Sequence, residues 1–130
     1  MITKRIIIET ASIENRIGKY LGILYKAHNL TNKQLDILLR LILKYQEIEK
    51  KYSPLKDTDL FNRLLFSADS RKEIRDSLGI NDNVFQNYFS ALRKKKVIKN
   101  NKLVTQYVPP LDDFELVFVF PKPNTDAKTS

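Results

Sequence analysis

Hydrophobic residues recur every three or four positions through much of the chain, which is the spacing of one buried helix face. Three segments follow this pattern before residue 67: 12–28, 31–51 and 59–66. Their predicted inner faces comprise Ile13, Ile17, Tyr20, Leu21, Leu24 and Tyr25, then Leu35, Leu38, Leu39, Ile42 and Leu43, then Leu60, Phe61, Leu64 and Leu65. Thr31 and Gln34 have the spacing of a capping box at a helix start, and Ser53-Pro54 ends the second pattern because a residue before proline disfavours helix. Three amphipathic helices are therefore predicted.

Two shorter helices are predicted next, joined at Gly79. Ser70 and Glu73 have the spacing of a second capping box, which would open a helix that ends at Leu78. Glycine after a helix accepts the left-handed conformation, and Asn81 can cap the helix that follows, from 82 to about 95. The apolar stripe of that helix comprises Val84, Phe85, Tyr88, Phe89 and Leu92. A sharp helix-turn-helix corner is the expectation, with Ile80 buried between the helices.

The remaining patterns indicate β structure. The segments 97–99 and 102–104 flank Asn100-Asn101, and asparagine tolerates the positive φ of a two-residue hairpin turn. Lys4–Glu9 is short and β-branched, which favours a strand. The apolar segment Glu115, Leu116, Val117, Phe118, Val119 and Phe120 would invite aggregation as an exposed edge. It is expected to pair with residues 6–8 of the same chain, or alternatively with another subunit by strand addition.

The expected fold is mainly α. Residues 1–56 would form an N-terminal strand and two-helix extension, residues 57–108 a helix-turn-helix module with its hairpin, and residues 109–130 a C-terminal strand and polar tail. A chain of 130 residues with 42% hydrophobic residues has enough apolar surface for one core. It has no cysteine, which excludes disulfides, thiolate metal sites and cysteine nucleophiles.

Positive charge is concentrated in one short segment. The formal net charge is +8, and residues 93–108 contain six basic and no acidic side chains. Such a segment suits a polyanion, although basic runs also serve solubility.

Residues 57–108 resemble the winged helix-turn-helix superfamily. Bacterial and phage regulators and replication proteins have sequences similar to the segment SRKEIRDSLGINDNVFQNYFSALRKKKVIKNNKLV. Lys96 stands where those proteins commonly have glycine. The resemblance implies that the helix after Gly79 enters the DNA major groove, with base contacts from Asn83, Gln86, Asn87, Ser90 and Arg93. It also implies phosphate contacts from Lys94, Lys95, Lys96, Lys99 and Lys102.

Two features argue against a simple transcription factor. The first helix of the corner is acidic, with Glu73 and Asp76, and Asp69 lies just before it, where DNA binding prefers neutral or basic groups. The two chain ends also add segments large enough for protein contacts. The alternative is therefore a structural subunit of a large assembly, such as a bacteriophage virion connector or tail ring. In such a subunit the winged helix would act as a protein-protein scaffold, and the chain would form a homo-oligomer.

No enzymatic site is predicted. His28 is the only histidine and is expected to lie at a helix end, where its cation would suit the helix dipole. Asp57 with Asp59, and Asp112 with Asp113, lack a third ligand or base. No cofactor, metal or small-molecule substrate is expected. The longest apolar run has five residues and no signal peptide is visible, so we expect no membrane contact and a location in the cytoplasm, or in a virion if the chain is phage-encoded.

Overall fold

The helix α2 (Asn32–Lys51) is the central element of the fold, and the other helices surround it. The computed structural model describes residues 1–124, except for the side chains of residues 25–28. The first helix ends at His28 as expected, but the burial expected for Tyr25, the side chain of His28 and the last six tail residues lie outside what the structure describes. The other helices are α1 (Ile13–His28), α3 (Thr58–Leu65), α4 (Ala68–Leu78) and α5 (Asp82–Lys94). The structure is mainly helical, with one small antiparallel sheet of β1 (Ile98–Lys99) and β2 (Lys102–Leu103).

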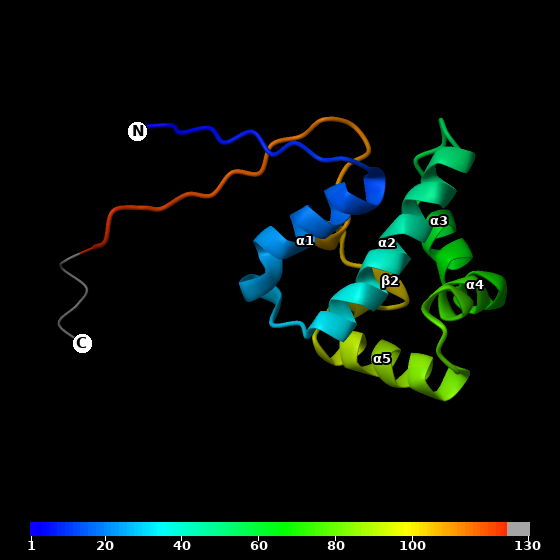
Figure 1. Cartoon of the computed structure of the whole chain (residues 1–130). Coiled ribbons are helices and arrows are strands. Elements are labelled where there is room, and N and C mark those ends of the chain that lie inside the picture. The colour runs from blue at the N-terminus through cyan, green and yellow to red at the C-terminus, as the bar shows by residue number, and fades with distance from the viewer. Residues whose placement is uncertain (125–130) are drawn as a thin grey trace.

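Figure 1 shows α1 along one side of α2, α3 and α4 along the other, and α5 crossing below its N-terminal end. This placement explains why α2 is buried more widely than its sequence pattern predicts. Its buried residues are Ile37, Leu38, Leu41, Ile42, Tyr45, Gln46 and Ile48. Leu35, Leu39 and Leu43, expected at the centre of the inner face, are only partly buried. A helix that contacts neighbours on several sides loses the one-sided pattern of a surface helix.

The capping box of α2 is confirmed. The Thr31 hydroxyl accepts from the Gln34 backbone N–H at 3.2 Å, and the Gln34 side chain accepts from the Thr31 N–H at 3.0 Å. Both bonds satisfy donors that the first helical turn leaves unpaired.

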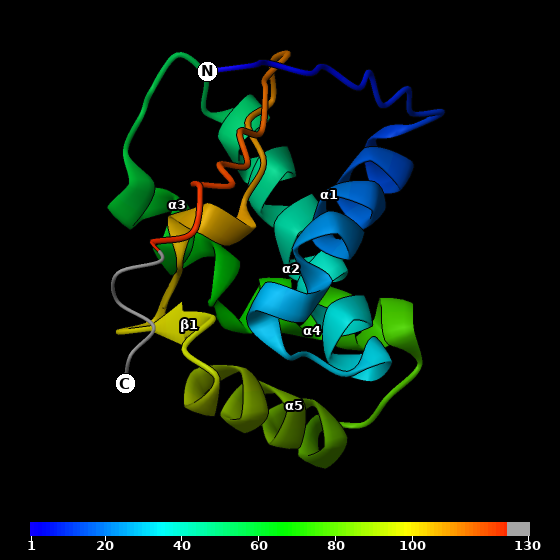
Figure 2. The same ribbon diagram turned by 90° about the vertical axis from the view of Figure 1, so that its left-hand side faces the viewer.

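One hydrophobic core joins residues on both sides of position 57. It runs from Ile17 in α1 through α2 to Phe89 in α5 and Leu103 in the hairpin. The 3₁₀ turn Thr105–Tyr107 then leads the chain back across α1 and α2 (Figure 2). There the Arg16 guanidinium donates to three carbonyls of residues 110–112, at 2.6, 3.3 and 2.5 Å.

The two strands expected at the chain ends do not form. Residues 1–10 and 113–124 contain no strand, so the expected pairing of 6–8 with 115–120 is wrong. The two segments are extended and are linked by an ion pair between Arg5 and Glu115 at 3.6 Å (Figure 1). An isolated two-stranded ribbon is marginal in water, and nothing in the described chain covers either segment.

Two details of the predicted helices are corrected. The helix α4 begins one turn earlier than Ser70, because Ser67 is its cap and accepts from the Ser70 N–H at 3.3 Å. Ser70 instead lies inside the helix, and its hydroxyl donates to the Leu64 carbonyl at 2.6 Å. Ile13, expected in the core, is 48% exposed because it opens α1 beyond the end of the packed surface.

Candidate nucleic-acid interface

The corner between α4 and α5 is held by backbone and side-chain contacts. Gly79 has a φ of 64°, and the N–H groups of Gly79 and Ile80 donate to carbonyls of the last turn of α4, at 3.2 and 3.3 Å. Asn81 caps α5 by accepting from the Val84 N–H at 2.9 Å. Across the corner, Arg75 and Asp82 form an ion pair at 2.7 Å. The predicted corner is thus present, although Ile80 is only partly buried.

The buried face of α5 leaves a polar face in water. Phe85, Phe89 and Leu92 are buried against the core, while Val84 and Tyr88 are partly buried. Asn83, Asn87, Ser90 and Lys94 are exposed and follow one another at intervals of three and four residues. We call these four residues the α5 stripe. None of their side chains has a hydrogen-bond or ion-pair partner within residues 1–124.

The end of α5 has the Schellman arrangement. The Lys96 N–H donates to the Arg93 carbonyl and the Val97 N–H to the Leu92 carbonyl, both at 3.0 Å. Lys96 adopts a φ of 62°, the left-handed conformation that glycine usually provides. Leu92 and Val97, which flank the turn, are both fully buried.

The hairpin follows at once. Asn100 and Asn101 have φ values of 52° and 56°, as a type I′ turn requires, and Lys99 pairs with Lys102 across the strands. Lys96, Lys99 and Lys102 are all exposed, so this end of the molecule carries the concentrated positive charge.

Two of the predicted phosphate-binding lysines are bound within the protein. Lys95 donates to the Asn29 carbonyl at 2.5 Å and to the Gln34 side chain at 2.8 Å, which ties the end of α5 to the start of α2. Lys102 donates to Asp59, and this hydrogen bond holds the pKa of that carboxyl below its ordinary value. Gln86 is partly buried, whereas Arg93 is exposed and lies over the Phe89 ring, with 5.7 Å between its guanidinium carbon and the ring centroid.

Acidic groups near the corner are partly neutralised. Glu73 forms an ion pair with Lys44 at 2.5 Å, and the hydrogen bond to Glu73 raises the pKa of that lysine. Asp82 is paired with Arg75. Asp69 and Asp76 have no ion-pair partner in the part of the chain that the structure describes.

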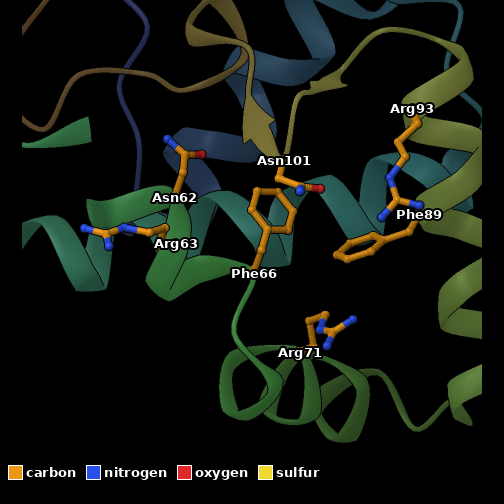
Figure 3. A pocket seen from close by; sticks show the side chains of 7 residues that line it. All are labelled: Asn62, Arg63, Phe66, Arg71, Phe89, Arg93 and Asn101. Atoms are coloured by element: carbon orange, nitrogen blue, oxygen red, sulfur yellow. The ribbon is translucent and has the colours of Figure 1, made fainter. Parts of the chain in front are cut away.

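Sequence patterns gave no indication of a cleft beside α5. It has a volume of about 320 Å³ and lies between the α3–α4 corner, α5 and the hairpin turn (Figure 3). Its lining residues are Asn62, Arg63, Phe66, Arg71, Phe89, Arg93 and Asn101. Only Arg93 was among the predicted site residues. The lining comes from segments up to 39 positions apart, so no local spacing could have indicated it.

The chain was also compared with known proteins. Protein-family models, curated proteins and solved structures gave no match. Within the described residues, every helix is too short or too polar to span a bilayer, and no three His, Cys, Asp or Glu side chains are grouped as a metal site would need.

Proposed function

We propose that the chain is a non-catalytic winged-helix protein that binds duplex DNA, with α5 in the major groove and the hairpin beside the backbone. The observation that carries the proposal is the α5 stripe, which is exposed and has no protein partner within residues 1–124. The order of helix, glycine corner, helix and basic hairpin supports it.

The chemistry of the α5 stripe suits base edges. The major groove is about 12 Å wide and admits a helix, and asparagine can make paired hydrogen bonds to adenine there. Asn83 and Asn87 lie one turn apart, so they could address neighbouring base pairs. Lys94, Lys96 and Lys99 are exposed near the end of α5 and would contact phosphates. Lys95 and Lys102 would contribute less, because protein oxygens already bind their ammonium groups.

Binding of a random-sequence duplex across a salt series tests this proposal without a known target. We expect the slope of log affinity against log salt to fall by about 1 for each of Lys94→Ala and Lys99→Ala, since each removes one phosphate contact. The matched control is the double variant of Lys50 and Lys56 to alanine. These exposed lysines belong to the last turn of α2 and to the segment that follows it, and Figure 1 shows α5 near the opposite, N-terminal end of α2.

The control variant should bind with the parent slope. Equal slopes for the Lys94/Lys99 double variant and for the Lys50/Lys56 double variant would reject α5 and the hairpin as the DNA-binding surface. Fluorescence anisotropy with labelled duplex is sufficient, and circular dichroism confirms that each variant is folded.

A second candidate function is a structural subunit of a large assembly. It is favoured by the apolar side chains exposed at the chain ends, of which Ile6 and Ile7 are each 87% exposed, Val117 77% and Phe120 91%. Exposed apolar segments of this kind serve as interaction surfaces. Sedimentation velocity at rising concentration tests it, with Phe118→Ser/Phe120→Ser as the comparison. A parent protein that stays monomeric, alone and with its native partners, would remove this candidate.

A further inference from the structure

The arginines of this protein divide into two groups by what they bind. Of the seven in the sequence, four bind protein oxygens. These four are Arg5 with Glu115, Arg16 with the carbonyls of 110–112, Arg40 with Glu14, and Arg75 with Asp82. The other three, Arg63, Arg71 and Arg93, have no hydrogen bond or ion pair within residues 1–124, and all three line the cleft beside α5. The guanidinium groups without an acceptor are thus gathered at one place.

Two of these arginines face the aromatic part of the cleft. In Figure 3, Arg71 extends from α4 toward the rings of Phe66 and Phe89, and Arg93 extends from α5 toward Phe89. The two rings meet edge to face at 5.7 Å between centroids. Arg63 points away from the rings in this view, and its charge contributes to the lowered pKa of Asp59. Arg71 and Arg93 are therefore the cations available inside the cleft.

Arg71 has a further feature that indicates a ligand. Its Nε is buried and has no hydrogen-bond partner in the described chain. A buried donor without an acceptor destabilises the folded state, since it loses its hydrogen bonds to water and gains none. Two neighbouring guanidinium groups without a counter-charge also repel each other. An anion in the cleft would satisfy the donor and reduce the repulsion.

The cleft is also suited to more than a simple ion. A volume of about 320 Å³ is at the lower end of the range for small-molecule sites. Its wall includes the partly buried Phe66 ring and the exposed amide residue Asn101. Asn62 is a fixed part of the wall, because its side chain donates to the Thr58 carbonyl at 2.8 Å and accepts from the Leu103 N–H at 2.9 Å.

We propose that this cleft binds the phosphate of a nucleotide, with Arg71 and Arg93 holding the phosphate oxygens and the Phe66 ring contacting the base. Guanidinium groups match phosphate geometry, because their planar donors can bond two oxygens at once. A base adds stacking on an aromatic ring, which every nucleobase can provide. The nucleotide could be free or part of a nucleic-acid strand, and the two sources share this chemistry.

The site is next to the proposed DNA-binding surface and shares Arg93 with it. The probes for the cleft contain no duplex. Nucleotide binding in the cleft can therefore fail while duplex binding by the α5 stripe holds, and duplex binding can fail while nucleotide binding holds.

Titrations of the full chain with four probes test the proposal. The probes are 2′-deoxyadenosine 5′-monophosphate, a twelve-nucleotide single strand, inorganic phosphate and 2′-deoxyadenosine. The readout is the arginine Nε–Hε region of the ¹H–¹⁵N spectrum, in which the Arg71 signal should move as its donor gains an acceptor. We expect saturation by the mononucleotide, the single strand or both, weaker binding of inorganic phosphate, and none of the nucleoside. Which of the first two binds more tightly identifies the source.

Variants connect the binding to the cleft. Arg71→Gln and Arg93→Gln should each weaken nucleotide binding about tenfold or more, because each removes charged hydrogen bonds to phosphate. Arg71→Lys keeps the charge but loses the paired donors, so its loss should be intermediate. Arg5→Gln is the matched control, since it removes a guanidinium at the chain ends.

Arg71→Gln is expected to fold, because the parent arginine has no partner to lose, and thermal unfolding checks this. Arg93 is exposed, so its variant tests the site independently. The proposal is overturned if neither nucleotide probe binds, if inorganic phosphate binds as tightly as the nucleotides, or if the Arg71→Gln/Arg93→Gln double variant binds like Arg5→Gln.

Discussion

Replacing Lys96 with glycine should make the folded state more stable. The turn after α5 and the turn after α4 have the same pair of backbone hydrogen bonds, yet the left-handed position is Gly79 in one and Lys96 in the other. A side chain at this conformation brings its Cβ close to the following carbonyl oxygen. The exposed Lys96 side chain has no partner within residues 1–124 that would offset the strain.

The magnitude follows from two opposing effects. The left-handed conformation costs a non-glycine residue about 1–2 kcal/mol. Glycine also has more conformational freedom in the unfolded chain, which reduces the gain in stability by about 0.4–1 kcal/mol. The net gain in free energy of unfolding is therefore about 0.5–1 kcal/mol, which corresponds to a rise in Tm of about 2–4 °C for a chain of this size.

Thermal unfolding followed by circular dichroism, supported by urea titration, measures this gain. Two controls separate strain from charge. Lys96→Ala removes the charge and keeps the strain, so its Tm should stay near that of the parent. Gly79→Ala introduces the strain at the other turn, where a Cβ would meet no atom within 4 Å outside its own and the two adjacent residues, so its loss of stability should be of similar size and come from the backbone conformation.

Equal Tm values for Lys96→Gly and Lys96→Ala would refute the reasoning, because they would show that the strain at this position is no larger than the unfolded-state freedom that glycine adds. A Gly79→Ala variant as stable as the parent would lead to the same conclusion for the other turn.

Three further outcomes are expected. Asn62→Ala should lower the free energy of unfolding by about 1–3 kcal/mol in urea titration, since it leaves a buried hairpin N–H unpaired; a loss below 0.5 kcal/mol would contradict this. Lys95→Met should lower it by about 1 kcal/mol, with little change in the salt slope of DNA binding, since two protein oxygens hold the ammonium group. Asp59→Asn should lower Tm at neutral pH only. Lys102 lowers the pKa of Asp59 from its ordinary 3.8, so as the pH falls this carboxyl takes up a proton in the unfolded chain before it does in the folded chain. The Tm difference between parent and variant should therefore disappear as the pH falls below 3.8. A difference that stays constant with pH would exclude the Asp59–Lys102 pair as its cause.

The correct predictions concern structure that neighbouring residues determine. The Thr31 capping box, the glycine corner and the asparagine turn each depend on residues within five positions of one another. The helical spacing also identified Phe85, Phe89 and Leu92 as buried, because a helix with one apolar face places it against the core.

The prediction of the start of α4 was wrong because two nearby serines can each cap a helix. Ser67 and Ser70 are both suitable caps for α4, and the sequence pattern favoured the second. The structure uses Ser67, because Ser70 can then donate to the carbonyl of Leu64 at the end of α3. That contact joins two helices, so it was not visible in the spacing of either one.

The amino-acid sequence by itself determined the helices of this protein, the corner at Gly79 and the hairpin turn, because each depends on backbone conformations and hydrogen bonds among near neighbours. Only the tertiary structure decided that α2 is central, that Lys95 is bound by oxygens more than 60 positions away, and that the partner-free arginines meet in one cleft. It also left the chain ends extended rather than paired as strands. These outcomes depend on which distant groups can reach one another once the core has formed, and no local pattern contains that information.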